Sequence, residues 1–76
     1  MTQGQRIKMI RKNLNLNLYY FSRLINIDEF TMAKIEKDEC QATDAMLKII
    51  CDECCANYDY LVFGNGDMFI EPPEEM

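Results

Sequence analysis

Two of the four cysteines in this 76-residue chain, Cys51 and Cys54, are spaced as CxxC, the pattern most directly suggestive of chemistry. Zinc ribbons and dithiol redox enzymes use this spacing. Here the pair falls inside an expected helix, the chain has no histidine, and no second pair stands at metal-ligand spacing. A redox motif would also have to open a helix within a βαβ unit, which the sequence lacks. We therefore expect reduced thiols, buried or half-exposed, with metal or redox chemistry as the remote alternative.

Other kinds of catalysis have no support in the residue types. The chain lacks histidine, a glycine-rich phosphate loop and a carboxylate pair spaced as in a cleft. We expect a protein that is not an enzyme and needs no cofactor or metal. No apolar run is long enough to cross a membrane, and the first residues do not form a signal peptide, so the expected location is the cytoplasm.

Two helices joined by a tight turn are expected in the middle of the chain, over Leu18 to Ile25 and over Glu29 to about Lys37. Asn17 and Asp28 stand directly before them, and both side chains can accept from unpaired N–H groups of a first helical turn. Asn26 tolerates the left-handed backbone that a tight turn often demands. Helix, short turn and helix form the layout of a helix-turn-helix. The expected inward residues of this pair are Phe21, Leu24, Ile25, Met32 and Ile35.

Three further short helices complete the expected fold, an all-α compact bundle of about five helices. They run from about Gln3 to Asn13, from Thr43 or Asp44 to about Cys55, and from Tyr58 to Phe63, the last between Asn57 and Gly64. We expect one domain over residues 1–70, ending in the short extended piece Met68-Phe69-Ile70, and an acidic, proline-containing tail over residues 71–76. The remaining core is expected from Ile7, Ile10, Leu14, Leu47, Ile50, Cys51, Cys54 and Leu61.

The order and spacing of several short motifs resemble the phage-repressor (Cro/repressor, or XRE-type) helix-turn-helix family over roughly residues 3–68. The matching residues are Arg6-Ile7-Lys8, Arg11-Lys12, Leu14-Asn15-Leu16, Phe21-Ser22, Ile25-Asn26-Ile27, Lys34-Ile35-Glu36 and Tyr60-Leu61-Val62-Phe63-Gly64. The resemblance implies a lambda-repressor-like bundle that binds double-stranded operator DNA, usually as a homodimer, with the second helix of the motif in the major groove. It also implies a structural role for Glu36, and a helix end at Cys55, where the family usually has glycine.

The same resemblance implies which side chains would contact DNA. A glutamate can accept from the amino group of cytosine, and a phenylalanine can pack on a thymine methyl. The base-reading candidates are Glu29, Phe30, Thr31, Ala33 and Lys34, and the backbone-contact candidates are Arg6, Asn17, Tyr19, Tyr20 and Lys37. Alternatively, Asp28 and Glu29 serve only as helix-start acids, and the tyrosines only cover the edges of the core.

The charge distribution is uneven. The formal net charge is −5, the wrong sign for the usual DNA-binding domain. Residues 1–26 carry five basic side chains and no acid, whereas residues 27–76 carry three lysines and thirteen acids. This asymmetry fits one basic face on DNA, or a domain that pairs with a charged protein.

Two departures from the family favour a protein partner as the alternative. Leu18 replaces a residue that is commonly glutamine and holds a phosphate, and Asp38 and Glu39 stand where basic residues often grip the DNA backbone. The alternative function is a helix-turn-helix scaffold that binds protein, such as an acidic phage-borne inhibitor of a nucleic-acid-binding protein. Candidates for dimer or partner contacts are Met46, Ile49, Met68, Phe69 and Ile70, and for the last three the alternative is packing on their own domain.

Overall fold

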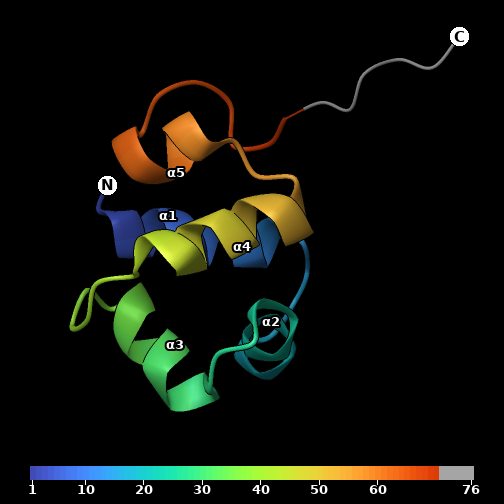
Figure 1. Ribbon diagram of the computed structural model, residues 1–76, viewed down its shortest axis with the longest axis vertical. Helices are drawn as coiled ribbons and strands as arrows, with labels where there is room; N and C mark the ends of the chain where they lie inside the picture. The colour runs from blue at the N-terminus through green and yellow to red at the C-terminus, as the bar shows by residue number, and fades with distance from the viewer. Residues whose placement is uncertain (71–76) are drawn as a thin grey trace, which may run out of the picture.

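Five α-helices and no β-strand make up residues 1–70, the part of the chain that the structure, a computed structural model, describes (Figure 1). The expected all-α bundle is therefore confirmed, and the predicted bounds are correct to within one residue. The tail predicted over residues 71–76 lies outside the described residues. The helices are α1 (Gln3–Asn13), α2 (Leu18–Ile25), α3 (Glu29–Glu36), α4 (Asp44–Cys54) and α5 (Tyr58–Phe63).

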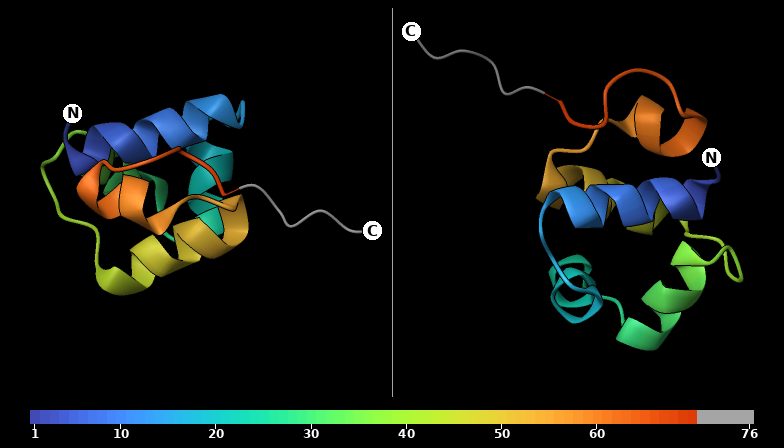
Figure 2. Two further views of the ribbon diagram at one scale, coloured as in Figure 1. Left: turned by 90° about the horizontal axis from the view of Figure 1, so that it is seen from above. Right: turned by 180° about the vertical axis from the view of Figure 1, so that it is seen from behind.

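The middle of the bundle is formed by α1 and α4, with α5 on one side and the pair α2–α3 on the other (Figures 1 and 2). Helix α1 packs on α3 and α5, α4 packs on α2 and α5, and α2 packs on α3. The helix-turn-helix thus lies at the end of the molecule opposite α5. Within residues 1–70, no helix is long and apolar enough to cross a membrane.

Each of the five helices begins at a side chain that accepts from its first-turn N–H groups, as the sequence predicts for Asn17, Asp28 and Asn57. Thr2 and Thr43 cap α1 and α4 in the same way. Asn26 ends α2 in the left-handed conformation, with φ at 64°. The N–H of Ile27 donates to the Ser22 carbonyl at 2.9 Å, which fixes the bend between α2 and α3.

The core contains nearly all the residues that the sequence predicts, with one error at Leu24. Leu24 is 40% exposed, because Phe21 and Ile25, four residues apart, occupy the inward line of α2. The third inward position belongs to Ser22, whose hydroxyl donates to the Leu18 carbonyl. Leu14 and Cys51 are only partly buried at the edge of the core. The buried hydrophobic residues are Ile7, Ile10, Phe21, Ile25, Met32, Ile35, Leu47, Ile50, Cys54, Ala56 and Leu61.

The extended piece after α5 returns to the end of α4 and pairs there through one antiparallel bridge, between Ala56 and Phe69. The Asn57 N–H donates to the Met68 carbonyl, and the Ile70 N–H donates to the Cys55 carbonyl, both at 2.9 Å. Met68 and Phe69 are half-buried against the core of their own domain, whereas Ile70 is 56% exposed.

The cysteines behave as the sequence predicts. All four are free thiols, with Cys54 buried and Cys51 half-buried. Burial, with the nearby Glu53 carboxylate, raises the pKa of the Cys54 thiol to about 11, and burial also raises the pKa of Cys51. Both thiols therefore stay protonated at neutral pH, which disfavours nucleophilic and metal-ligating roles.

Replacing Cys55 with glycine is expected to stabilise the protein by about 0.5–1 kcal/mol, measured by urea unfolding. Cys55 is exposed and ends α4 in the left-handed conformation, with φ at 55°, which strains any side chain except that of glycine or asparagine. Asn26→Gly is the matched control, because asparagine already tolerates this conformation, and its gain should be smaller. A stability loss in Cys55→Gly would contradict the assignment of strain to this residue.

Candidate nucleic-acid interface

Helix α3 presents an aromatic ring and an ammonium group together on its outer side. Phe30 is 71% exposed, and the Lys34 Nζ lies 4.6 Å from the centroid of its ring. The two residues are four apart on the helix, so they face the same way while Met32 and Ile35 face the core. Of the other base-reading candidates, Glu29 is exposed and Ala33 is half-buried on the same helix.

The start of α3 uses one of the predicted contact residues internally. The Thr31 hydroxyl donates to Asp28 Oδ1 at 2.7 Å, and the Thr31 N–H donates to Asp28 Oδ2 at 2.9 Å. These two bonds hold the pKa of the Asp28 carboxyl below its ordinary value of 3.8. The charged cap is therefore present at neutral pH and is lost only as the pH falls below that value. Thr31 is thereby committed to the cap, and its hydroxyl is less available for a base than the sequence predicts.

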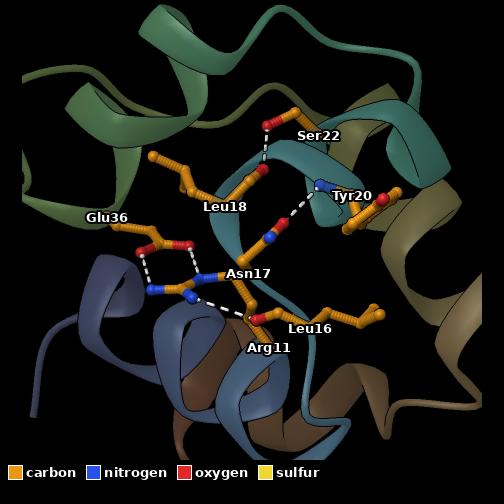
Figure 3. Close-up of polar contacts among 7 residues, drawn as sticks. All are labelled: Arg11, Leu16, Asn17, Leu18, Tyr20, Ser22 and Glu36. Carbon is orange, nitrogen blue, oxygen red and sulfur yellow. Dashed lines mark hydrogen bonds and ion pairs between the residues drawn. The ribbon is translucent and has the colours of Figure 1, made fainter.

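A nearly buried ion pair joins α1 to α3 (Figure 3). Arg11 Nε donates to Glu36 Oε2 at 2.8 Å and Arg11 Nη2 to Glu36 Oε1 at 3.0 Å, so the carboxylate is held by two parallel bonds. The third donor, Arg11 Nη1, reaches the Leu16 carbonyl at 3.1 Å, directly before α2 begins. One guanidinium thus joins the end of α1, the approach to α2 and the end of α3. This confirms the structural role expected of Glu36.

The outer side of α2 carries both tyrosines and a basic residue, Arg23, that was not among the predicted contacts. Tyr19 and Tyr20 are 47% and 60% exposed, with ring centroids 5.2 Å apart in an edge-to-face arrangement. The Arg23 guanidinium lies 5.5 Å from the Tyr19 ring centroid and donates to its hydroxyl at 3.2 Å. Tyr19 and Arg23 are four residues apart in a helix, and this spacing could have indicated from the sequence that the two side chains meet. Arg23 also lines a hollow at the α2–α3 turn with Asn26, Ile27 and Asp28.

Asn17 and Leu18 begin α2 in different ways. Asn17 Oδ1 accepts from the Tyr20 N–H at 2.8 Å. The Asn17 side chain is exposed, and its amide Nδ2 has no hydrogen-bond partner among residues 1–70, so this nitrogen can donate outward. Leu18 is half-buried and packs against the core. The residue that departs from the family pattern therefore contributes to packing in place of a phosphate contact.

Arg6, for which the family resemblance implies a phosphate contact, donates three hydrogen bonds within its own domain. Its Nε and Nη2 donate to the Leu61 and Val62 carbonyls at 3.0 and 3.1 Å, and its Nη1 donates to the Met1 carbonyl at 2.7 Å. The Arg6 guanidinium therefore satisfies carbonyls of α5, which lies across α1 and α4 from α3 (Figure 1). Lys37, at the end of α3, remains exposed.

One of the two acids expected to oppose DNA binding, Asp38, also makes hydrogen bonds inside the fold. Asp38 Oδ1 accepts from the Gly4 N–H at 3.1 Å and Asp38 Oδ2 from the Thr2 hydroxyl, so this carboxylate lies at the start of α1. Asp28 caps α3. Asp28, Glu29, Asp38 and Glu39 are nevertheless all exposed, so four acids lie on or beside α3.

The candidate dimer or partner residues separate into two groups. Met46, Met68 and Phe69 are partly buried against the core, and for Met68 and Phe69 this agrees with the alternative of packing on their own domain. Ile49 and Ile70 are 36% and 56% exposed. Within residues 1–70, no three metal-ligating side chains lie together.

The turn, its two helices and the bundle around them define a helix-turn-helix fold. A crystal structure of the P22 c2 repressor protein in complex with the synthetic operator 9T, in the presence of Tl+, has a similar fold, with a TM-score of 0.78. The similarity covers 86% of this chain and 98% of that chain, at 20% sequence identity. No protein-family model matches the chain, and no curated protein matches it.

Proposed function

We propose that this protein is a small transcription regulator of the phage-repressor type, which binds operator DNA as a dimer with α3 in the major groove. The observation that carries the proposal is the outer side of α3, where Phe30 and Lys34 project from a helix braced by the Arg11–Glu36 ion pair. The operator complex of the structurally similar repressor supports the same ligand class. A rigid helix with exposed cationic and apolar groups fits the width of the major groove.

In this proposal the two helices divide the contacts. Base edges are read by Phe30, Lys34 and Glu29, with Ala33 allowing close approach. Tyr19 holds the Arg23 guanidinium through its ring and its hydroxyl, so the charge is positioned before DNA binds. The phosphate backbone is contacted by exposed residues on or beside α2 and α3, namely Arg23, Tyr19 or Tyr20, Asn17 and Lys37.

A protein partner is the second candidate. The observation in its favour is that Tyr20, Leu24 and Phe30 are large, exposed and apolar in part, at 60%, 40% and 71% exposure. Aromatic residues of this kind are common at protein interfaces. The exposure of Asp28, Glu29, Asp38 and Glu39 also fits the acidic-surface version of this candidate.

The test is a mobility-shift assay on a library of genomic fragments that includes the DNA flanking the gene. We expect retarded fragments whose affinity falls steeply with salt. Lys34→Ala should weaken binding to such a fragment about tenfold and relax the base preference at the position that Lys34 reads. Lys48→Ala, which removes a lysine from α4, is the charge-matched control and should bind nearly as wild type. No shift at low salt, together with recovery of another protein in a pull-down that depends on Phe30, would favour the second candidate.

A further inference from the structure

The outer side of α1 combines basic and apolar side chains. Lys8, Met9 and Lys12 are exposed there, and the two lysines lie one helical turn apart. Neither lysine forms an ion pair within residues 1–70. An open hollow on this side is lined by Met1, Gln5, Lys8, Met9 and Lys12. Methionine side chains are flexible and adapt to the shape of an apolar partner, so this side of α1, which we call the basic face, is suited to an apolar group flanked by acids.

The outer side of α4 has the opposite sign. Ile49 is 36% exposed, and the exposed carboxylates of Asp52 and Glu53 follow it by about one helical turn. Neither acid forms an ion pair within residues 1–70. With Asp44 and Lys48 included, the exposed side chains of α4 carry a formal charge of −2, against +2 for those of α1. This side of α4, which we call the acidic face, therefore complements the basic face in its charge and in its apolar centre.

The two faces point away from each other. Seen from above, α1 and α4 lie on opposite sides of the molecule, and both direct their buried residues into the shared core (Figure 2). Two copies of the chain therefore cannot make both contacts with each other. When the basic face of one copy meets the acidic face of a second, one face of each sign is left over, and a further copy can add at either end.

We infer that the partner of both faces is a second copy of this chain, bound head to tail. Ile49 of one copy lies in the methionine-lined hollow of the next, where its two acids meet Lys8 and Lys12. The net charge of −5 does not prevent this contact, because salt screens distant charges beyond about 8 Å at 0.15 M ionic strength. The contact goes beyond the operator-bound dimer of the proposed function and needs no DNA. The pair α2–α3 lies at one end of the bundle, so a contact through the middle of α1 and α4 does not have to cover α3 (Figure 1).

Sedimentation equilibrium of the protein without DNA tests the inference. At a concentration of about 1 mM in about 0.15 M salt, we expect a weight-average mass about twice that of the monomer and still rising, because the contact is small and made of exposed charges. At about 1 M salt, which screens charges beyond about 3 Å, the mass should fall toward that of the monomer.

Two charge-reversed variants identify the faces. Lys8→Glu/Lys12→Glu has two acidic faces, and Asp52→Lys/Glu53→Lys has two basic faces, so each alone should stay monomeric. An equimolar mixture of the two should recover the wild-type mass, because the reversed face of each variant again meets a face of opposite sign on the other. Circular dichroism checks that both variants are folded.

The net charge provides a control for non-specific attraction. Asp52→Lys/Glu53→Lys moves the formal net charge from −5 to −1, a change that by itself promotes association. A loss of association in this variant therefore reports on the acidic face. Glu39→Lys/Asp67→Lys makes the same change in charge at exposed positions outside both faces and should associate at least as strongly as wild type.

Three results would overturn the inference. A mass that stays at the monomer value at about 1 mM, or levels off at the dimer value, would exclude a head-to-tail contact. Association of both reversed variants at the wild-type level would place the contact on another surface. A mixture that stays monomeric would show that the two faces do not meet. None of these results bears on the mobility shift of DNA, so failure of this inference is distinguishable from failure of the proposed function.

Discussion

Replacing Glu36 with alanine is expected to lower the free energy of unfolding by about 3–5 kcal/mol, because the substitution leaves a nearly buried guanidinium without its carboxylate. The Glu36 side chain is 6% exposed and the Arg11 side chain 13%. Total stability of a small domain is itself only about 5–15 kcal/mol, so the variant should unfold at a much lower urea concentration than wild type. Urea unfolding monitored by circular dichroism measures the loss directly.

Two controls assign this loss to the buried charge. Glu39→Ala removes an exposed carboxylate three residues further along the chain and should change stability by less than about 0.5 kcal/mol. The double variant Arg11→Met/Glu36→Leu removes both charges and should recover much of the lost stability, because no unpaired ion is left buried. A loss below about 1 kcal/mol in Glu36→Ala would show that the ion pair does not brace the fold.

The same pair connects folding to the proposed site. Arg11 reaches Glu36 at the end of α3 and the Leu16 carbonyl before α2, so the double variant removes these contacts even where stability recovers, while the direct packing of α2 on α3 remains. If the proposed function is correct, this variant should fold yet bind DNA less tightly than wild type. Stability and positioning are thereby measured as separate quantities.

The features that could be predicted from the sequence are those that depend on neighbouring residues. Asn17 and Asp28 cap helices whose N–H groups lie three residues away, and Asn26 adopts the left-handed turn because its side chain tolerates it. Helical spacing alone identified Phe21, Met32 and Ile35 as core. Local chemistry is sufficient for such assignments, which explains the accuracy of the helix bounds.

The errors arise where distant parts of the chain decide the outcome. Leu24 has helical spacing suited to the core, but its exposure depends on how α2 lies against α4 and α3. Arg6 finds its carbonyl partners 55 and 56 residues away, in α5. Asp38 finds its N–H partner 34 residues away, at Gly4. No pattern within one helix indicates that Arg6 meets the carbonyls of Leu61 and Val62 or that Asp38 meets the N–H of Gly4, so these contacts could not be predicted from the sequence.

Replacing Gly4 with alanine is expected to destabilise the protein by about 3 kcal/mol, although alanine is the better helix former. A Cβ at Gly4 would lie 2.3 Å from the Ile35 carbonyl oxygen, 2.6 Å from Asp38 Oδ1 and 3.0 Å from the Glu36 carbonyl oxygen. Two of these three atoms belong to the backbone at the end of α3 and cannot rotate away. Helix α1 must therefore move off α3, which strains the Gly4–Asp38 hydrogen bond and the Arg11–Glu36 ion pair together.

The sign of this effect, measured by urea unfolding, distinguishes close packing from helix propensity. In a solvent-exposed helix, glycine to alanine stabilises by about 0.5–1 kcal/mol, so propensity alone predicts the opposite result. Lys8→Ala, at an exposed position of the same helix, is the control and should be nearly neutral. Combining Gly4→Ala with Asp38→Gly removes the side-chain clash but leaves the Ile35 carbonyl in place, so it should not restore stability. Recovery of stability in that double variant would mean that a Cβ at Gly4 clashes only with the Asp38 side chain. The close approach of α1 to the α3 backbone would then not be what positions the outer side of α3.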